Sequence, residues 1–258
     1  MEEANPISAR RGLWLRSERA LGLESVAAIA PVQSPSPTAT TALFEAPIAD
    51  SSALATEFSS PIFPREQKLS LLSAMDQGEV KPCQRCRLCE SRKHTVFGEG
   101  DPDARIFFIG EGPGENEDLQ GRPFVGRAGD LLNKMIAAMG LGREQVFIAN
   151  IVKCRPPANR VPAPDEVAAC TPYLLRQLEI IRPQVIVTLG LPASKYMLDS
   201  KLSMGKLRGQ WHQWRGIKLM PTFHPAYLLR SYTEENRAMV WSDLQKVMAE
   251  VGLTAPSR

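Results

Sequence analysis

Residues 184–189 read QVIVTL, a run without a charged side chain and the most strand-like stretch of the chain. A strand that is apolar on both faces is typical of the interior of a parallel sheet, where helices cover the sheet from both sides. Three similar short runs are predicted as further strands, at residues 105–109 (RIFFI), 145–149 and 217–222.

Segments with helical character separate these strands. Residues 164–181 begin with Pro-Asp-Glu, and acidic residues at the start of a helix interact favourably with its dipole. Helices are also predicted at residues 128–139, 190–198 and 235–251. This order predicts an α/β fold with a doubly wound, mainly parallel four-stranded sheet and helices on both faces.

The chemically varied segments of the chain all follow predicted strands. They are residues 111–124, 150–160, Gly190 and residues 223–230. In a doubly wound sheet, ligands bind just beyond the carboxyl ends of the strands. Loops of this length and variety therefore indicate a binding site rather than simple connections.

Composition divides the chain into two parts. Residues 1–65 are rich in Ser, Pro, Ala and Thr without a sustained period, which predicts a disordered or loosely attached tail before one folded domain at residues 66–258. No apolar stretch of signal-peptide or membrane-span length is present. A monomeric, soluble, cytoplasmic protein without a membrane partner is expected, and a net charge of +3 alone predicts nothing about nucleic acid.

The spacing of the cysteines is typical of metal ligation. Of the five cysteines, Cys83 and Cys86 form a C-x-x-C pair, while Cys154 and Cys170 flank a proline-rich segment. Four thiolates from two places in the chain can close one site for zinc or for an iron-sulfur cluster, and spacing does not choose between these. Cys86 and Cys89 form a second C-x-x-C pair, so Cys89 is an alternative to Cys83.

Several motifs resemble one known family. The segments GEGPGENEDLQGRPFVGRAG (110–129), NIVKCRPPANR (150–160) and FHPAYLLR (223–230), together with the cysteine spacing, closely resemble the family 4 iron-sulfur uracil-DNA glycosylases of bacteria and archaea. The likeness runs from about Cys83 to Gly252. It implies a base excision repair enzyme that flips uracil out of DNA and hydrolyses its N-glycosidic bond, leaving an abasic site. It also implies a 4Fe-4S cluster, mainly structural, with Cys83, Cys86, Cys154 and Cys170 as ligands.

The resemblance assigns three residues to the uracil pocket. Phe124 would supply the face on which the flipped base stacks, and its glycine-rich setting favours an exposed turn over a core position. The carbonyl of Asn150 can accept from uracil N3–H while its amide donates to O4, although an Asn at a strand end also caps turns. His224 corresponds to the histidine that stabilises negative charge on uracil O2 as the bond breaks.

The catalytic water has no certain partner in the sequence. Other uracil glycosylase families carry a water-activating aspartate at the position that is Gly112 here. Either Glu111 positions the water, or a largely dissociative cleavage needs little help from a base. Glu117 is a candidate to lie near C5 and exclude the methyl group of thymine, a discrimination worth about 1–3 kcal/mol by packing.

Basic residues in the same segments are candidates for phosphate contacts, among them Arg155, Arg208 and Arg230. The full set is Arg122, Arg127, Lys153, Arg155, Arg160, Lys206, Arg208 and Arg230. Leu228 and Leu229, in a segment expected to be an exposed loop, are candidates for a wedge that fills the gap left by the flipped base, with simple packing as the alternative.

Two other functions fit the same motifs. One is a non-catalytic accessory protein that binds uracil-DNA and joins a replication or repair partner through its N-terminal tail, near the nucleoid. Relatives that trap uracil-DNA covalently carry an inserted basic loop with a histidine, and residues 155–164 contain no histidine. The other is an iron-sulfur glycosylase with broader base specificity, which release of hypoxanthine would reveal.

Overall fold

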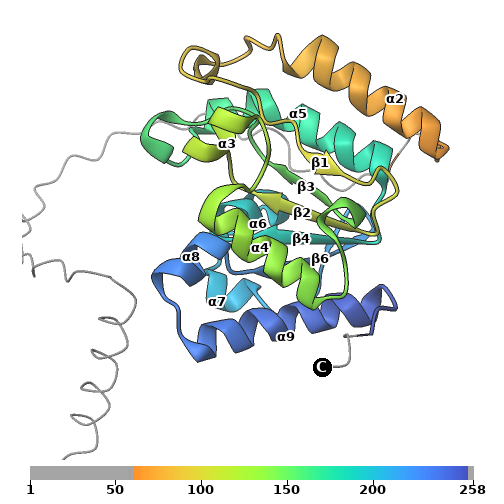
Figure 1. Cartoon of the computed structure of the whole chain (residues 1–258), viewed down its shortest axis with the longest axis vertical. Helices are drawn as coiled ribbons and strands as arrows, with labels where there is room; N and C mark the ends of the chain where they lie inside the picture. Colours follow the sequence, from red (N-terminus) through yellow and green to blue (C-terminus); the bar gives the residue numbers. More distant parts are fainter. Residues whose placement is uncertain (1–57, 59–60, 255–258) are drawn as a thin grey trace, which may run out of the picture. The chain divides into compact units, whose positions relative to one another are not determined.

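The computed structural model describes Phe58 and residues 61–254. The predicted N-terminal tail therefore lies outside the described residues, except for Phe58 and residues 61–65. The first described helix, α2, spans Arg65–Met75 and continues into a π-helical turn at Asp76–Val80. It packs along α5 on one side of a central sheet (Figure 1).

The sheet has six strands in the order β1-β3-β2-β4-β6-β5. The four inner strands pair in parallel. They are β2 (Ile106–Gly110), β3 (Phe147–Asn150), β4 (Val185–Leu189) and β6 (Ile217–Thr222). Two short antiparallel edge strands complete the sheet: β1 (Glu99–Gly100) and β5 (His212–Trp214). The α/β class is thus confirmed, whereas the predicted count of four strands is wrong, because these edge strands are too short and polar to show a period.

The side chains of β2 alternate between two apolar cores. Phe107 and Ile109 enter one core, and Ile106 and Phe108 enter the other, all at most 1% exposed. Full burial of one such side chain stabilises the fold by about 1.5–3 kcal/mol. The first core is covered by α2, α5 (Pro164–Ile181) and α6 (Leu191–Leu198), and the second by α4 (Gly126–Ala138), α8 (Pro225–Arg230) and α9 (Glu234–Glu250) (Figure 1).

Several short elements lie in the connections. The helices α3 (Glu115–Gln120) and α7 (Met204–Leu207) and the 3-10 turns Arg87–Cys89, Arg143–Gln145 and Pro157–Asn159 were not expected. The first turn of α3 carries Glu115, Glu117 and Asp118, and these acids suit the positive end of its dipole. Within the described residues, no helix combines the length and apolarity that a membrane crossing needs.

Candidate active site

One cavity of about 860 Å³ opens at the carboxyl ends of the inner strands. Each of the four parallel strands contributes a wall residue at its last position or directly after it, around the point where the chain crosses from β3 to β4 on the other side of β2. The predicted site residues that line this pocket are Glu111, Gly112, Glu117, Phe124, Asn150, His224 and Arg230.

Phe124 forms one wall of the pocket from a strained turn. Its φ of 49° lies in the left-handed region that favours glycine, and Arg143 holds the turn by donating to the carbonyl of Phe124 at 3.2 Å. The ring is only 5% exposed and packs into the second core, so the expected exposed turn is wrong for this side chain. The ring centroid lies 5.4 Å from that of His224 at an interplanar angle of 31°.

Gly110 makes room for the base-reading residues. A Cβ atom at this position would lie 2.3 Å from Oδ1 of Asn150 and 2.5 Å from Cζ of Phe124. The last residue of β2 therefore has to be glycine if both side chains are to reach the pocket.

Asn150 lines the pocket and carries a buried side-chain oxygen, Oδ1, without a hydrogen-bond partner among the described residues. The residue ends β3 and is 2% exposed. Buried polar atoms are nearly always paired, because an unpaired one loses its interaction with water without replacement. An acceptor kept vacant in a pocket wall is suited to a ligand N–H group.

The hydrogen bonding of His224 fixes which ring nitrogen carries the proton. His224 caps the N-terminus of α8, and its Nδ1 atom accepts from the backbone N–H of Ala226 at 3.0 Å. Nδ1 is therefore unprotonated, and the neutral ring carries its hydrogen on Nε2. Loss of solvation, followed by the positive charge of Arg230, lowers the pKa of His224 to about 4. The pocket thus holds a neutral N–H donor at physiological pH.

Glu117 ties the glycine-rich turn to the Phe124 turn. One carboxylate oxygen accepts from the N–H of Gly114 at 3.0 Å and the other from the N–H of Val125 at 2.9 Å. Glu111 is half-buried at the pocket wall, and this burial raises its pKa above the usual range. Gly112 lies beside Val152, whose Cγ2 atom would be 2.8 Å from a Cβ at that position.

A second, smaller cavity is lined by Cys83, Cys86, Cys154 and Cys170. Cys89 is not among the residues that line it, and the choice between Cys83 and Cys89 as a ligand stays a prediction. Burial raises the pKa of the Cys154 thiol and raises that of Cys170 to about 12. Two N–H groups point at these sulfurs: Arg92 Nη1 lies 3.2 Å from the Sγ atom of Cys154, and the backbone N of Lys153 lies 3.1 Å from that of Cys170.

The lining of this cavity combines four cysteines with basic side chains. Among the described residues, no three His, Cys, Asp or Glu side chains converge closely enough to hold a single metal ion. Four sulfurs nevertheless face one hollow, with the cationic side chains of Arg85 and Arg92 in its wall. N–H donors and positive charge around thiolates are features that stabilise an anionic iron-sulfur cluster.

Several predicted phosphate contacts are instead engaged within the protein. Arg208 donates to the Asp243 carboxylate at 2.7 Å, and Asp243 also accepts from the hydroxyl of Thr222 at 2.7 Å. Arg208 therefore braces the end of β6 rather than facing DNA, and its prediction as a DNA contact is corrected. Lys153 is 1% exposed and equally unavailable.

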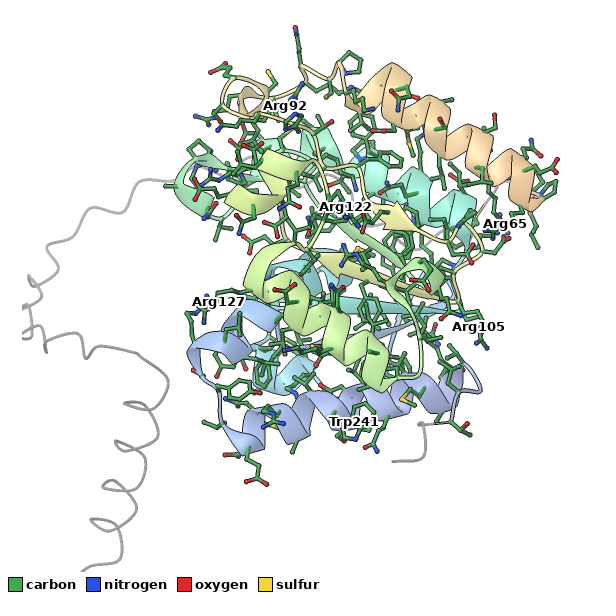
Figure 2. The ribbon with its side chains drawn as sticks, viewed as in Figure 1. Arg65, Arg92, Arg105, Arg122, Arg127 and Trp241 are labelled. Carbon is green, nitrogen blue, oxygen red and sulfur yellow. The ribbon has the colours of Figure 1, made fainter. Side chains whose placement is uncertain are left out.

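Other members of the predicted basic set divide into paired and unpaired residues. Arg122 pairs with Glu99, and Arg160 pairs with the buried carboxylate of Glu166. Arg155 donates to Asn159 at 2.8 Å. Three exposed residues have side chains that form no hydrogen bond or ion pair with the described part of the chain: Arg127, Lys206 and Arg230. Figure 2 shows Arg127 pointing outward at the start of α4.

The expected exposed loop at residues 223–230 is wrong. Residues 225–230 of this segment form helix α8, and Leu228 is 2% exposed in the second core, so this side chain packs inward rather than forming a wedge. Leu229 is partly exposed and stays a candidate. Sequence reasoning also missed the pocket residues of α7, Met204 and Gly205, because a four-residue helix is too short to show a helical period.

The strand order and the strand-end pocket define an α/β protein with a ligand site at the switch point of its sheet. The chain belongs to the Uracil DNA glycosylase superfamily, whose family profile matches residues 97–246.

Its relatives include proteins named Type-4 uracil-DNA glycosylase. That of Thermotoga maritima is 49% identical, over 72% of this chain and 95% of the relative. That of Saccharolobus solfataricus is 50% identical, over 66% of this chain and 82% of the relative. That of Sulfurisphaera tokodaii is 49% identical, over 66% and 80% respectively. These relatives confirm the resemblance to family 4 that the motifs indicated.

Proposed function

We propose that this chain is a uracil-DNA glycosylase of the iron-sulfur type, which extrudes uracil from DNA and hydrolyses its N-glycosidic bond. The observation that carries the proposal is the vacant Oδ1 atom of Asn150, in a pocket that it shares with Phe124 and His224. Uracil complements this pocket, because it has a flat ring that can stack on Phe124 and an N3–H group that can donate to Asn150. Cytosine presents an acceptor at N3 and would leave the Asn150 oxygen unpaired, which a buried site penalises.

Cleavage would depend on two polar groups of the pocket, His224 and Glu111. As the bond from N1 to C1′ breaks, its electron pair moves into the uracil ring, and negative charge grows on O2. The neutral His224 ring donates from Nε2 to that oxygen, while its Nδ1 bond to Ala226 keeps the ring oriented. A water oxygen then bonds to C1′ and gives up its proton. Glu111, with its raised pKa, is the group that we assign to hold this water and take the proton.

The cysteine cavity would hold a 4Fe-4S cluster through Cys83, Cys86, Cys154 and Cys170. The cluster, when bound, fastens the segment after α2 to the segment after β3 and supplies no step of the hydrolysis. Arg92 (Figure 2) and the backbone N–H of Lys153 would donate to two of its ligands.

The exposed cations near the pocket are assigned to the DNA backbone. Arg230 lines the pocket itself, and Lys206 and Arg127 lie in elements that contribute other residues to its wall. Arg155 joins this set once its bond to Asn159 is exchanged for a phosphate, and Leu229 is assigned to the gap in the base stack. A cytoplasmic, nucleoid-associated monomer, with a tail at residues 1–65 that contacts a replication or repair partner, completes the proposal.

The test is release of uracil from a labelled oligonucleotide with one deoxyuridine, followed by alkali to cut the abasic strand. We expect cleavage at that position by the full chain, and a loss of about 10²–10³-fold in rate for His224→Ala. Lys134→Ala, on the exposed face of α4, is the control and should cut at the normal rate. Binding to uracil-DNA without cleavage would favour the non-catalytic accessory function, and release of hypoxanthine would favour the broader glycosylase.

A further inference from the structure

Lys153 is a buried lysine that lines the cysteine cavity and contacts Asn150 of the pocket wall. Its side chain is 1% exposed, and its Nζ atom donates to the backbone carbonyl of Asn150 at 3.0 Å and to Oε1 of Gln177 at 2.7 Å. Its backbone N–H points at the Sγ atom of Cys170, as described above. The residue therefore contacts the base-reading asparagine on one side and a cysteine of the second cavity on the other.

Stability alone does not explain a lysine at this place. Neither acceptor of the Nζ atom carries a charge, and no ion pair joins Lys153 to a carboxylate within the described residues. Burying an amine is costly whether it keeps its charge or gives up a proton, and an apolar side chain of similar length would avoid that cost. A function in the neighbouring site accounts for the lysine better.

The contacts of Lys153 are themselves held from outside the pocket. Gln177, on α5, is fully buried and donates through Nε2 to the carbonyl of Phe97 at 2.9 Å, which turns its Oε1 atom toward Lys153. The carbonyl of Lys153 accepts from the N–H of Val96 at 2.7 Å. Hydrogen bonds thus hold both the backbone of Lys153 and the acceptor of its side chain, which fixes the position of the Nζ atom.

The Nζ bond acts on the peptide group that carries the Asn150 side chain. β3 ends at Asn150, and the chain bends directly afterwards toward Cys154. The sheet holds the N–H end of the same peptide group, because the N–H of Ile151 donates to the carbonyl of Gly110 at 3.0 Å. The Asn150 carbonyl receives its bond from Lys153, so the direction of the side chain depends on that bond as well as on the strand.

We infer that Lys153 is a positioning residue of the pocket, whose buried Nζ donor aims Asn150 at the base without touching the base itself. The inference rests on the proposed function. A displacement of about 1 Å in a reacting geometry can lower a rate about 10²-fold. If the Asn150 amide is free to tilt, kcat should therefore fall more than the affinity for DNA.

The test compares Lys153→Met with Lys68→Met in the full-length, cluster-containing protein. Lys68 is a matched control, because it is also a buried lysine, with its Nζ atom 3.2 Å from the carbonyl of Ile181 and 2.9 Å from Asp103, remote from the pocket. The measurements are kcat and KM on a uracil oligonucleotide, inhibition by free uracil, visible absorbance of the cluster and the melting temperature.

We expect Lys153→Met to lower kcat about 10–100-fold and to weaken inhibition by free uracil, with KM for the oligonucleotide within about 2-fold and the cluster absorbance unchanged. Lys68→Met should lower the melting temperature and leave kcat and uracil inhibition unaltered. Gln177→Met removes one anchor of the lysine but keeps the Nζ donor. It should give a smaller loss in the same direction, and it keeps the inference testable should Lys153→Met not fold.

Three results would overturn the inference. They are a normal kcat for Lys153→Met, equal losses of kcat in both lysine variants, and a loss of kcat that only accompanies loss of the cluster absorbance. Absence of uracil release by the unaltered protein would instead contradict the proposed function, so the two failures are distinguishable.

Discussion

Gly110 faces Asn150 so closely that a Cβ atom on the glycine would lie 2.3 Å from the asparagine Oδ1. Gly110→Ala must therefore displace either the amide that reads the base or the Phe124 ring beside it. We expect a loss of kcat of at least about 10²-fold, since small displacements of reacting groups have effects of that size. Gly78→Ala is the matched control, because a Cβ there would meet nothing within 4 Å. Near-normal uracil release by Gly110→Ala would show that the asparagine and the phenylalanine do not form the base site.

The pH dependence of stability should report the neutral state of His224. The pKa of His224 falls to about 4 through loss of solvation and the nearby Arg230, whereas the unfolded chain titrates near the ordinary value of 6.5. Above pH 6.5 His224 is neutral in both the folded and the unfolded state, and its contribution to stability is fully present. Between 6.5 and 4 only the unfolded state gains the proton, so stability is lost as the pH falls through this window.

Urea unfolding at pH 7 and pH 5 measures this effect. The non-titrating variant His224→Gln should lose less stability between the two pH values than the unaltered protein. His212→Gln serves as the comparison, because its ring contacts the carbonyl of Leu207 at 3.0 Å away from the pocket. Equal losses for the unaltered protein and His224→Gln would mean that His224 titrates normally when folded.

Arg208 and Arg230 should behave differently toward DNA. Removing a side chain that binds a phosphate reduces the slope of log affinity against log salt by about one contact. Arg230→Ala should show that reduction, because its side chain is exposed at the pocket mouth. Arg208→Ala should leave the slope unchanged and lower stability by about 3 kcal/mol, because it strands the buried Asp243 carboxylate. Salt titrations of DNA binding and thermal melts distinguish the roles of Arg208 and Arg230. A reduced slope for Arg208→Ala would show that Arg208 contacts a phosphate after all.

The cysteine assignment makes a spectroscopic prediction. The protein purified in air should be brown, with broad absorbance at about 400 nm, as expected of an iron-sulfur cluster. Cys154→Ser should lose this band, whereas Cys89→Ser should keep it, because Cys89 does not line the cavity. A colourless, zinc-loaded protein with full activity would contradict the cluster.

The Glu117 carboxylate should stabilise the two turns that it joins, besides any effect on the choice between uracil and thymine. Glu117→Ala leaves the N–H groups of Gly114 and Val125 without their acceptor, which costs about 1–3 kcal/mol for each group that stays buried. We expect a lower melting temperature and slower uracil release. Release of thymine by the variant is the measurement for the gate near C5. A variant that cuts uracil normally and still refuses thymine would rule out the gate role, and an unchanged melting temperature would rule out the stabilising role.

The inner part of the fold was predictable because its signals are local. The runs that became β2 and β4 are apolar on both faces, and their strand ends had to share one edge of the sheet, which is why Phe124, Asn150 and His224 could be placed in one pocket. The pairing of Arg208 with Asp243 was not predictable, because the two are 35 positions apart and only the packing of α9 on β6 brings them together.

The wrong expectations share a physical origin. β1 has two residues and β5 has three, so each depends on its neighbour in the sheet rather than on its own pattern. Helix α8 is too short for a helical period, and Leu228 therefore looked exposed. The neutral state of His224 also depends on burial, which the motif around it does not reveal.

The most direct test of the central claim is calorimetric binding of free uracil and of 3-methyluracil. The account predicts that uracil binds, and that 3-methyluracil binds at least about 10²-fold more weakly, because the methyl group removes the donor that the Asn150 oxygen needs and leaves that oxygen buried and unpaired. The Asn150→Ala variant should bind uracil and 3-methyluracil with similar affinity. Equal binding of uracil and 3-methyluracil by the unaltered protein would contradict the claim that this asparagine reads the base.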